Sequence, residues 1–187
     1  LFQELNIAKE KYSMAVGNAL EYLENIEEGS FDTVLCLGML YYTTEPYRLL
    51  KLMLRAAKEM VILDTFTAAY AAIQGKEAPQ VYESVNEETL KLPILLTALT
   101  QPEKKDYTLP HSFDYRSKDL SLITLPSAEL LEIWFQSLNA QFKKMDWSTY
   151  GTRPCTYHDL LTPDQKKSSH WADVYTSGIR VSYLLHK

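Results

Sequence analysis

The chain has 187 residues, and 46% of them are hydrophobic, which suffices for one well-buried domain and is short for two. The formal net charge of −5 weighs against a protein whose main partner is a phosphate backbone, although a local basic face is compatible with that sum. The two cysteines, Cys36 and Cys155, lie far apart, so they indicate neither a disulfide framework nor a metal-binding pair. No apolar run approaches the roughly 20 residues of a membrane span, so we expect a soluble, cytoplasmic protein without a membrane partner.

The amino-terminal part of the chain predicts two helices and two strands. Apolar residues at helical spacing predict a helix over residues 2–11, and SMAV (13–16) has the pattern of a short strand. Residues 18–26 have the pattern of an amphipathic helix, which Gly29 ends. The continuous apolar run TVLCLG (33–38) is typical of a central parallel strand that is buried on both faces.

Residues 44–66 continue this alternation. Pro46 suits the first turn of a helix whose apolar stripe includes Leu49 and Met53. The next apolar run, MVILDTF (60–66), predicts another strand. Helix and strand therefore alternate along this half of the chain, which indicates an α/β fold with a parallel sheet and covering helices.

Residues from 67 to about 125 lose this rhythm and carry four prolines, over a length too great for an ordinary connection. We interpret them as an insertion that shapes the substrate side. Order returns at Ser127, a good N-cap for a helix with a buried face. Strands are expected over 142–147 and 179–186, and we interpret residues 1–187 as a single domain.

Three stretches of the chain resemble the class I S-adenosylmethionine-dependent methyltransferases: GNALEYL (17–23), FDTVLCLGMLYYTTEP (31–46) and EMVILDTF (59–66). They are similar to the family's segment after the third strand, to its fourth strand with the following loop, and to its fifth strand. Within the family, the chain is most similar to the tRNA wobble-uridine carboxymethyltransferase group, through GMLYY, the DTF strand end and LITLPSAELLEIWFQSLNAQF (122–142). The resemblance covers less than half of the chain.

This resemblance implies a Rossmann-like sheet of strand order 3-2-1-4-5-7-6 and a cofactor, either S-adenosylmethionine or its carboxylated derivative. The family's glycine-rich loop and the acidic residue that ends its second strand are absent from this sequence. We therefore expect strands 1 and 2 to be missing from this chain, which would leave a third strand at 13–16 without a partner. Upstream residues, or another chain in a homodimer or by strand exchange, would complete the sheet. Tyr42 also departs from the family, because many relatives carry histidine there.

Cofactor binding is implied for two segments, one at a helix start and one at a strand end. A glycine at position 38 would let the backbone approach the cofactor, and a tyrosine ring or hydroxyl beyond it could meet a cation or the moving group. The amide of Asn18 could bind a purine edge. The alternatives are structural: Gly38 only ends a strand, the tyrosines pack against the insertion, and Asn18 caps a helix. The candidates are Asn18, Ala19, Leu37, Gly38, Met39, Tyr41 and Tyr42.

Arg153 and Arg180 are the candidates for substrate binding, because the carboxylated ligand of the family would need a cationic partner near the last strands. Each of them is also consistent with an ordinary surface arginine. Asp64 ends a strand on the expected ligand side, either as a catalytic acid or as a cap or solvated loop residue, so the catalytic residues stay unknown. The four histidines lack ligand spacing, and no metal is implied.

Two functions from different classes remain open. The first is a methyltransferase, active or inactive as this fragment, that transfers a methyl or carboxymethyl group to a small molecule or a tRNA base. The second is a degenerate methyltransferase-like domain that binds no cofactor and acts as a non-catalytic interaction module. The missing cofactor loops favour the second function, and the GMLYY region favours the first.

Overall fold

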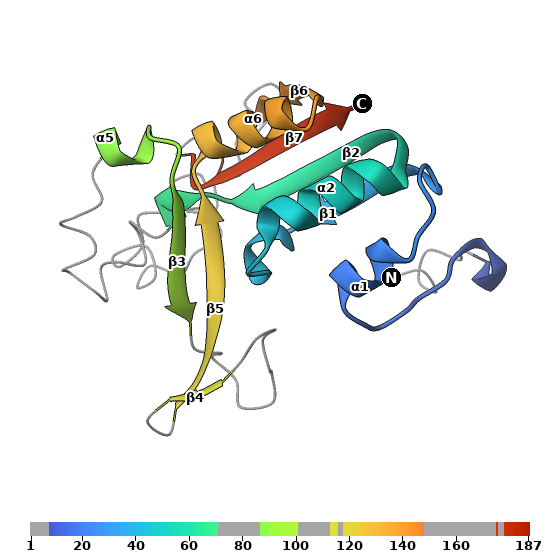
Figure 1. Ribbon diagram of the computed structural model, residues 1–187, viewed down its shortest axis with the longest axis horizontal. Helices are drawn as coiled ribbons and strands as arrows, with labels where there is room; N and C mark the ends of the chain where they lie inside the picture. The colour runs from blue at the N-terminus through green and yellow to red at the C-terminus, as the bar shows by residue number, and fades with distance from the viewer. Residues whose placement is uncertain (1–7, 71–86, 101–112, 116–117, 148–174, 176–177) are drawn as a thin grey trace.

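The computed structural model describes residues 8–70, 87–100, 113–115, 118–147, 175 and 178–187. These residues form a mixed α/β structure with two sheets (Figure 1). One sheet has four strands and carries helices, and the other has three strands and lies within the predicted insertion.

The four-stranded sheet combines parallel and antiparallel pairs. Its strands are β1 (Phe31–Leu37), β2 (Ala57–Phe66), β7 (Arg180–His186) and β6 (Gln141–Lys144), in the spatial order β1-β2-β7-β6. β1 and β2 run parallel, whereas β7 is antiparallel to both β2 and β6. The carboxyl ends of β1 and β2 therefore lie at one end of the sheet, next to the start of β7.

Helices α2 (Pro46–Ala56) and α6 (Ala128–Ser137) cover one face of this sheet, and α1 (Ala19–Glu24) packs against α2 (Figure 1). Each begins with the signal expected from the sequence. Pro46 occupies the first turn of α2, and the Ser127 hydroxyl accepts a hydrogen bond of 3.2 Å from the backbone N–H of Leu130. Their apolar sides and the facing strand residues form the main core, which includes Leu50, Leu63, Phe135, Tyr183 and Leu185.

Helix α1 is fastened to α2 largely by two arginines of α2. The Arg55 Nη2 donates hydrogen bonds to the carbonyls of Leu23, Glu24 and Ile26, over 2.5, 3.0 and 3.0 Å. These carbonyls lie at the end of α1, where helical partners run out, so Arg55 serves as its carboxyl-terminal cap. Arg48, in the first turn of α2, adds an ion pair with Glu24.

The second sheet consists of β3 (Leu95–Thr100), β5 (Lys118–Pro126) and β4 (Phe113–Tyr115), in the order β3-β5-β4 with antiparallel pairing. It projects away from the main sheet, and the short helix α5 (Glu87–Leu90) precedes it (Figure 1). Thr124 of β5 donates a hydrogen bond of 2.7 Å to the carbonyl of Thr43. The base of this sheet is thereby joined to the segment that follows β1.

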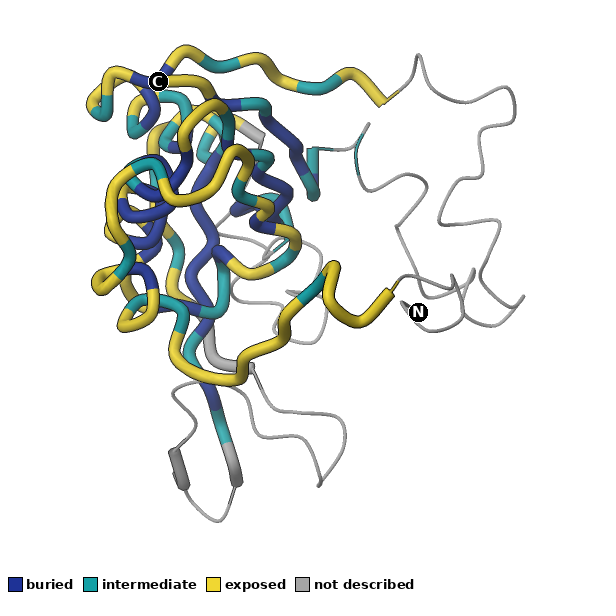
Figure 2. Tube along the Cα trace, turned by 90° about the vertical axis from the view of Figure 1, so that its right-hand side faces the viewer, coloured by how far each residue is buried: buried dark blue, intermediate teal, exposed yellow. Residues whose placement is uncertain are grey.

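One expectation for the amino-terminal part is wrong, and another is largely untested. Residues 13–16 form no strand, and Met14 and Val16 are exposed instead of paired (Figure 2). Of the helix expected over 2–11, only the 3₁₀ turn η1 (Lys9–Lys11) lies in the described part, because residues 1–7 lie outside it. The extended pattern of 13–16 cannot form a strand here, since no described strand lies beside it to complete its backbone hydrogen bonds.

The position of β1 also differs from the expectation. Among the described residues, β1 is an edge strand and not a central one. Its face toward the helices is covered, but Leu35 and Leu37 on the opposite face are 61% and 56% exposed. The continuous apolar run thus marks a strand whose second face and outer edge are open in the described structure.

Candidate functional site

The tip of β1 is built around Gly38, which directly follows the strand. Its φ of +70° lies in the left-handed region, which favours glycine, and its N–H donates to the carbonyl of Asp64 over 2.8 Å. A Cβ at this position would lie 3.3 Å from the Arg180 Nη2 and 3.4 Å from the Tyr41 Oη. The backbone conformation therefore favours glycine here, and a larger side chain would have to displace the ends of Arg180 and Tyr41.

Asp64 lies beside this glycine in a network of donors. It pairs in register with Leu37 across β1 and β2 and is only 5% exposed. Its carboxylate accepts hydrogen bonds from the Tyr175 Oη (3.1 Å), the Arg180 Nε (2.5 Å) and the Ser182 Oγ (2.5 Å), and it forms an ion pair with the Arg180 Nη2. With both oxygens occupied, this carboxylate is arranged to hold neighbouring groups rather than to accept a proton from a ligand.

A row of aromatic rings continues from this network. Neighbouring ring centroids lie 4.3 Å apart for Tyr42 and Tyr41, 5.0 Å for Tyr41 and Phe66, and 4.3 Å for Phe66 and Tyr70. The Arg180 guanidinium carbon lies 4.9 Å from the centroid of Phe66, in a cation–π arrangement. Burial, followed by the neighbouring Tyr42, raises the pKa of Tyr41, so its hydroxyl stays protonated.

These rings also pack against the insertion, as the structural alternative for the tyrosines predicted. Ile123 and Leu125 of β5 form a small apolar cluster with Tyr41, Tyr42 and neighbouring rings. The insertion therefore supplies one wall beside the tip of β1.

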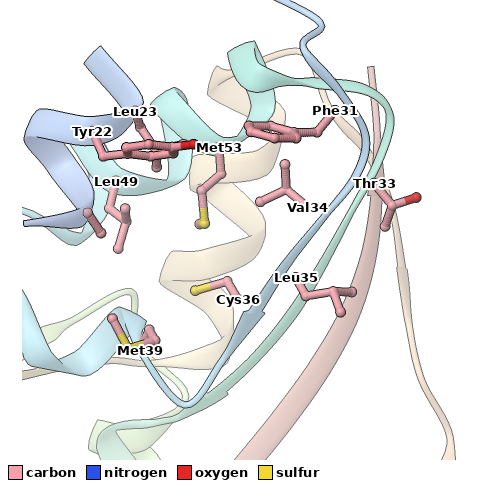
Figure 3. Close-up of a pocket in the computed structure, with 11 residues that line it drawn as sticks. Tyr22, Leu23, Phe31, Thr33, Val34, Leu35, Cys36, Met39, Leu49 and Met53 are labelled. Carbon is pink, nitrogen blue, oxygen red and sulfur yellow. The ribbon is translucent and has the colours of Figure 1, made fainter. Parts of the chain in front are cut away.

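A cavity of about 330 Å³ lies on the other side of β1, between this strand, α1 and α2 (Figure 3). Cys36 and Met53 point their sulfur atoms toward it, and Tyr22 and Leu23 close it from α1. Burial raises the pKa of Cys36 to about 11, so the thiol is neutral near pH 7. The lining is largely apolar and consists of Ala19, Tyr22, Leu23, Phe31, Thr33, Val34, Leu35, Cys36, Met39, Leu49 and Met53.

The structure divides the predicted cofactor residues into two groups. Gly38 and Tyr41 meet Arg180 at the tip of β1, with Tyr42 next to Tyr41. Ala19 and Met39 line the cavity instead. The two groups are joined through the chain, because Met39 directly follows Gly38.

The remaining predicted residues have less defined roles. Asn18 is exposed and caps α1, since its Oδ1 accepts from the backbone N–H of Leu20 over 2.9 Å and its Nδ2 donates to the Glu21 carboxylate over 3.2 Å. Leu37 ends β1 with an exposed side chain. Arg153 lies outside the described residues.

Sequence reasoning missed the residues that surround Asp64 and Arg180. Ser182, Tyr175 and Phe66 were not among the candidates, although the alternation in β7 puts Arg180 and Ser182 on one face. The register that pairs Asp64 with Ser182 joins segments more than a hundred residues apart. That register was the missing signal.

Neither a metal cluster nor a membrane span is found in the described part of the chain. No group of three or more His, Cys, Asp or Glu side chains there could hold a metal ion. No helix there has the length and apolar character needed to cross a membrane.

Comparison with known proteins gives structural similarity only. No protein-family model matches the chain, and no curated protein matches it. Among solved structures, a SAM-dependent methyltransferase from Archaeoglobus fulgidus is 10% identical, with a TM-score of 0.43 over 99% of this chain and 72% of that one. A candidate methyltransferase from Bacillus halodurans C-125 is 12% identical, with a TM-score of 0.34 over 98% of this chain and 73% of that one. We draw no conclusion about activity from either similarity.

Proposed function

We propose that this chain is part of an S-adenosylmethionine-dependent methyltransferase. The observation that carries the proposal is the left-handed Gly38 at the carboxyl end of β1, between the hydroxyl of Tyr41 and the guanidinium of Arg180. Ligands of open α/β sheets bind at this end of the strands, where a residue without a side chain leaves room for them. The GMLYY segment, on which the resemblance rests, supplies this glycine.

The topology of the main sheet supports the proposal. The order β1-β2-β7-β6, with β1 and β2 parallel and β7 antiparallel, agrees with strands 4-5-7-6 of the order expected from the resemblance. Strands 1 and 2 of that order would then lie next to β1. The open edge of β1 and its exposed Leu35 and Leu37 suit such an addition.

The residues at the tip of β1 fit the sulfonium and purine ends of the cofactor. Gly38 leaves free the space that a Cβ would take next to the Arg180 Nη2 and the Tyr41 Oη, and Ala19 and Met39 line the neighbouring apolar cavity. The ribose and amino-acid groups of the cofactor require the glycine-rich loop and an acidic residue at the end of the second strand, which this chain lacks. Upstream residues, a homodimer partner or strand exchange would supply them.

Methyl transfer is an in-line displacement, for which the protein mainly has to hold the acceptor and the methyl group at attack distance and angle. The cofactor supplies the electrophilic methyl group, or a carboxymethyl group in its carboxylated form. In the latter case Arg180 would be the cationic partner of the extra carboxylate. The net charge of −5 and the apolar wall of β5 favour a small-molecule acceptor over a tRNA base.

Calorimetry of the complete protein, including the residues that complete the sheet, with S-adenosylmethionine, its carboxylated derivative and S-adenosylhomocysteine tests this proposal. We expect at least one of them to bind, and we expect Gly38→Val to abolish binding because the new side chain would fill the space that the glycine leaves free. Gly17→Val is the matched control, since nothing lies within 4 Å of a Cβ at Gly17. Labelled cofactor with total tRNA or with a metabolite extract then identifies the acceptor class.

A degenerate, non-catalytic interaction module is the second candidate. The observation in its favour is the open edge of β1 beside an apolar cavity of about 330 Å³, together with the absent glycine-rich loop. The same calorimetry separates the two functions. An absence of heat with all three compounds, in a folded protein, would leave the interaction module.

A further inference from the structure

The Arg180 guanidinium is held on two sides at the tip of β1. One edge, formed by the Nε and Nη2, is directed at the Asp64 carboxylate, and one face lies over the ring of Phe66. The side chain is still 25% exposed, and its Nη2 points toward Gly38. Arginine has five N–H donors, and among the described residues Asp64 takes two of them, which leaves three.

Asp64 also cancels the charge of this arginine. The carboxylate is buried, and its other donors, the Tyr175 and Ser182 hydroxyls, are neutral. The pKa of Tyr175 is raised, first by burial and then by the charge of Asp64, so this phenol adds no negative charge. The pair next to Gly38 therefore has a net charge close to zero.

Charge balance matters here because the proposed cofactor carries a positive sulfur. At an effective dielectric constant near 20, an unpaired guanidinium about 12 Å from a cationic ligand would weaken its binding roughly tenfold, and a closer one would weaken it more. A neutral pair avoids this repulsion and still presents N–H donors to an oxygen of the ligand.

We propose that Asp64 is a positioning and charge-balancing residue, an inference that rests on the proposed function. It fixes the plane of the Arg180 guanidinium and cancels its charge, so that the tip of β1 accepts a sulfonium ligand. The site thereby favours a cation that also carries an oxygen acceptor within reach of Arg180. This role differs from proton abstraction, because both oxygens of Asp64 already accept hydrogen bonds.

The ratio of the affinities for S-adenosylmethionine and S-adenosylhomocysteine tests this role, because the two compounds differ by a methyl group and the positive charge it brings. In Asp64→Asn the arginine charge is uncompensated, and we expect the ratio to fall roughly three- to tenfold. In Arg180→Gln the carboxylate is uncompensated, and we expect the ratio to rise. In the double variant Asp64→Asn/Arg180→Gln the site is neutral again, and the ratio should return close to that of the unaltered protein.

Thermal unfolding and the NMR signal of the Arg180 Nε–H accompany the calorimetry. The Nε–H signal should lose its downfield shift in Asp64→Asn, which a general loss of affinity would not explain. If Asp64→Asn does not fold, Arg180→Gln and the double variant still carry the test. An unchanged ratio in folded variants would overturn the charge-balancing role, whereas an unaltered protein that binds neither compound would overturn the proposed function itself.

Discussion

The two faces of the main sheet are built from the same strands but differ sharply in burial. On the helix-covered face, Leu63 of β2 and Leu185 of β7 are fully buried. On the opposite face, Leu35 is 61% exposed and its neighbour Ile62 is half-buried. Residues next to each other along one strand thus have different surroundings, because side chains alternate between faces.

This difference shows which part of the sequence pattern determines burial. The apolar stripes of α2 and α6 select the face that they cover, and the capping signals fix where these helices begin. The continuous apolar run of β1 indicates only that side chains on both faces of the strand can be buried. What covers the second face is a property of other elements, and the run itself carries no information about them.

Truncating one leucine on each face should give the largest contrast. We expect Leu63→Ala to lower the free energy of unfolding by about 3 kcal/mol, because it leaves a cavity in the main core. Leu35→Ala should lower it by less than about 0.5 kcal/mol, because its side chain is mostly in water. Urea unfolding of both variants measures the difference. Equal costs would mean that the second face is covered in solution.

The second largest effect on stability is expected at the tip of β1, where the candidate site lies. Gly38→Ala should lower the free energy of unfolding by about 1–2 kcal/mol, because alanine disfavours a φ of +70° and its Cβ would crowd Arg180. Gly17→Ala has neither restriction and should not destabilise the protein. Thermal unfolding of the two variants compares them, and equal melting temperatures would contradict the described geometry.

The buried side of β1 should give a smaller, pH-dependent effect through Cys36. Burial raises the pKa of this thiol from 9.0 to about 11, so the unfolded chain loses the proton first as the pH rises. Since the native state then binds more protons, stability falls with rising pH, by about 1 kcal/mol between pH 8 and pH 10. Denaturant unfolding at both pH values measures this fall.

Cys36→Ala is the control for that effect. The variant has no titrating thiol at position 36, so the unaltered protein should lose more stability than the variant between pH 8 and pH 10. Parallel pH profiles would show that the thiol is exposed to water in solution. A thiol reagent that modifies Cys36 at pH 8 in the folded protein would lead to the same conclusion.

The smallest effect is expected for the exposed segment before α1. Val16→Ser should change the free energy of unfolding by less than about 0.5 kcal/mol, because the side chain makes no buried contact. Thermal unfolding measures it, with Val61→Ser in the core as the destabilised counterpart. A large loss in Val16→Ser would indicate that this segment is covered in solution, as a paired strand at 13–16 would be.

The elements of the main sheet could be predicted from local signals. The strand expected over 60–66 is confirmed within β2, which begins earlier, at Ala57, and the helix from Pro46 is confirmed as α2. Ser127 caps its helix as predicted. Such signals depend on a few neighbouring residues and are therefore visible in one sequence.

The second sheet could not be predicted in the same way. In β5, Ile123, Thr124 and Leu125 are all buried, so the strand lacks the simple alternation of a half-exposed strand. The burial of these side chains depends on packing against Tyr41, which follows β1, and Phe66, which ends β2. Partners this distant in the sequence leave no local pattern.

The candidate site was predictable at Gly38, its neighbours and Arg180, through the resemblance. The contact of Asp64 with Arg180 depends on the register between β2 and β7, which pairs Phe66 with Arg180 and Asp64 with Ser182. Single residues of β7 give no indication of that register. The cofactor roles of the predicted residues stay predictions.

The attachment of α1 to α2 and to the main core has a consequence for the width of the cavity. One side chain, Arg55, ties three carbonyls at the carboxyl end of α1, while the amino end is held by the helix's own Asn18. The carboxyl end of α1 is therefore bound to α2, and the helix lies over the apolar cavity beside β1. Because Ala19 and Leu20 pack against the main core, moving that end of α1 would break apolar contacts, so the cavity favours ligands that fit its present width.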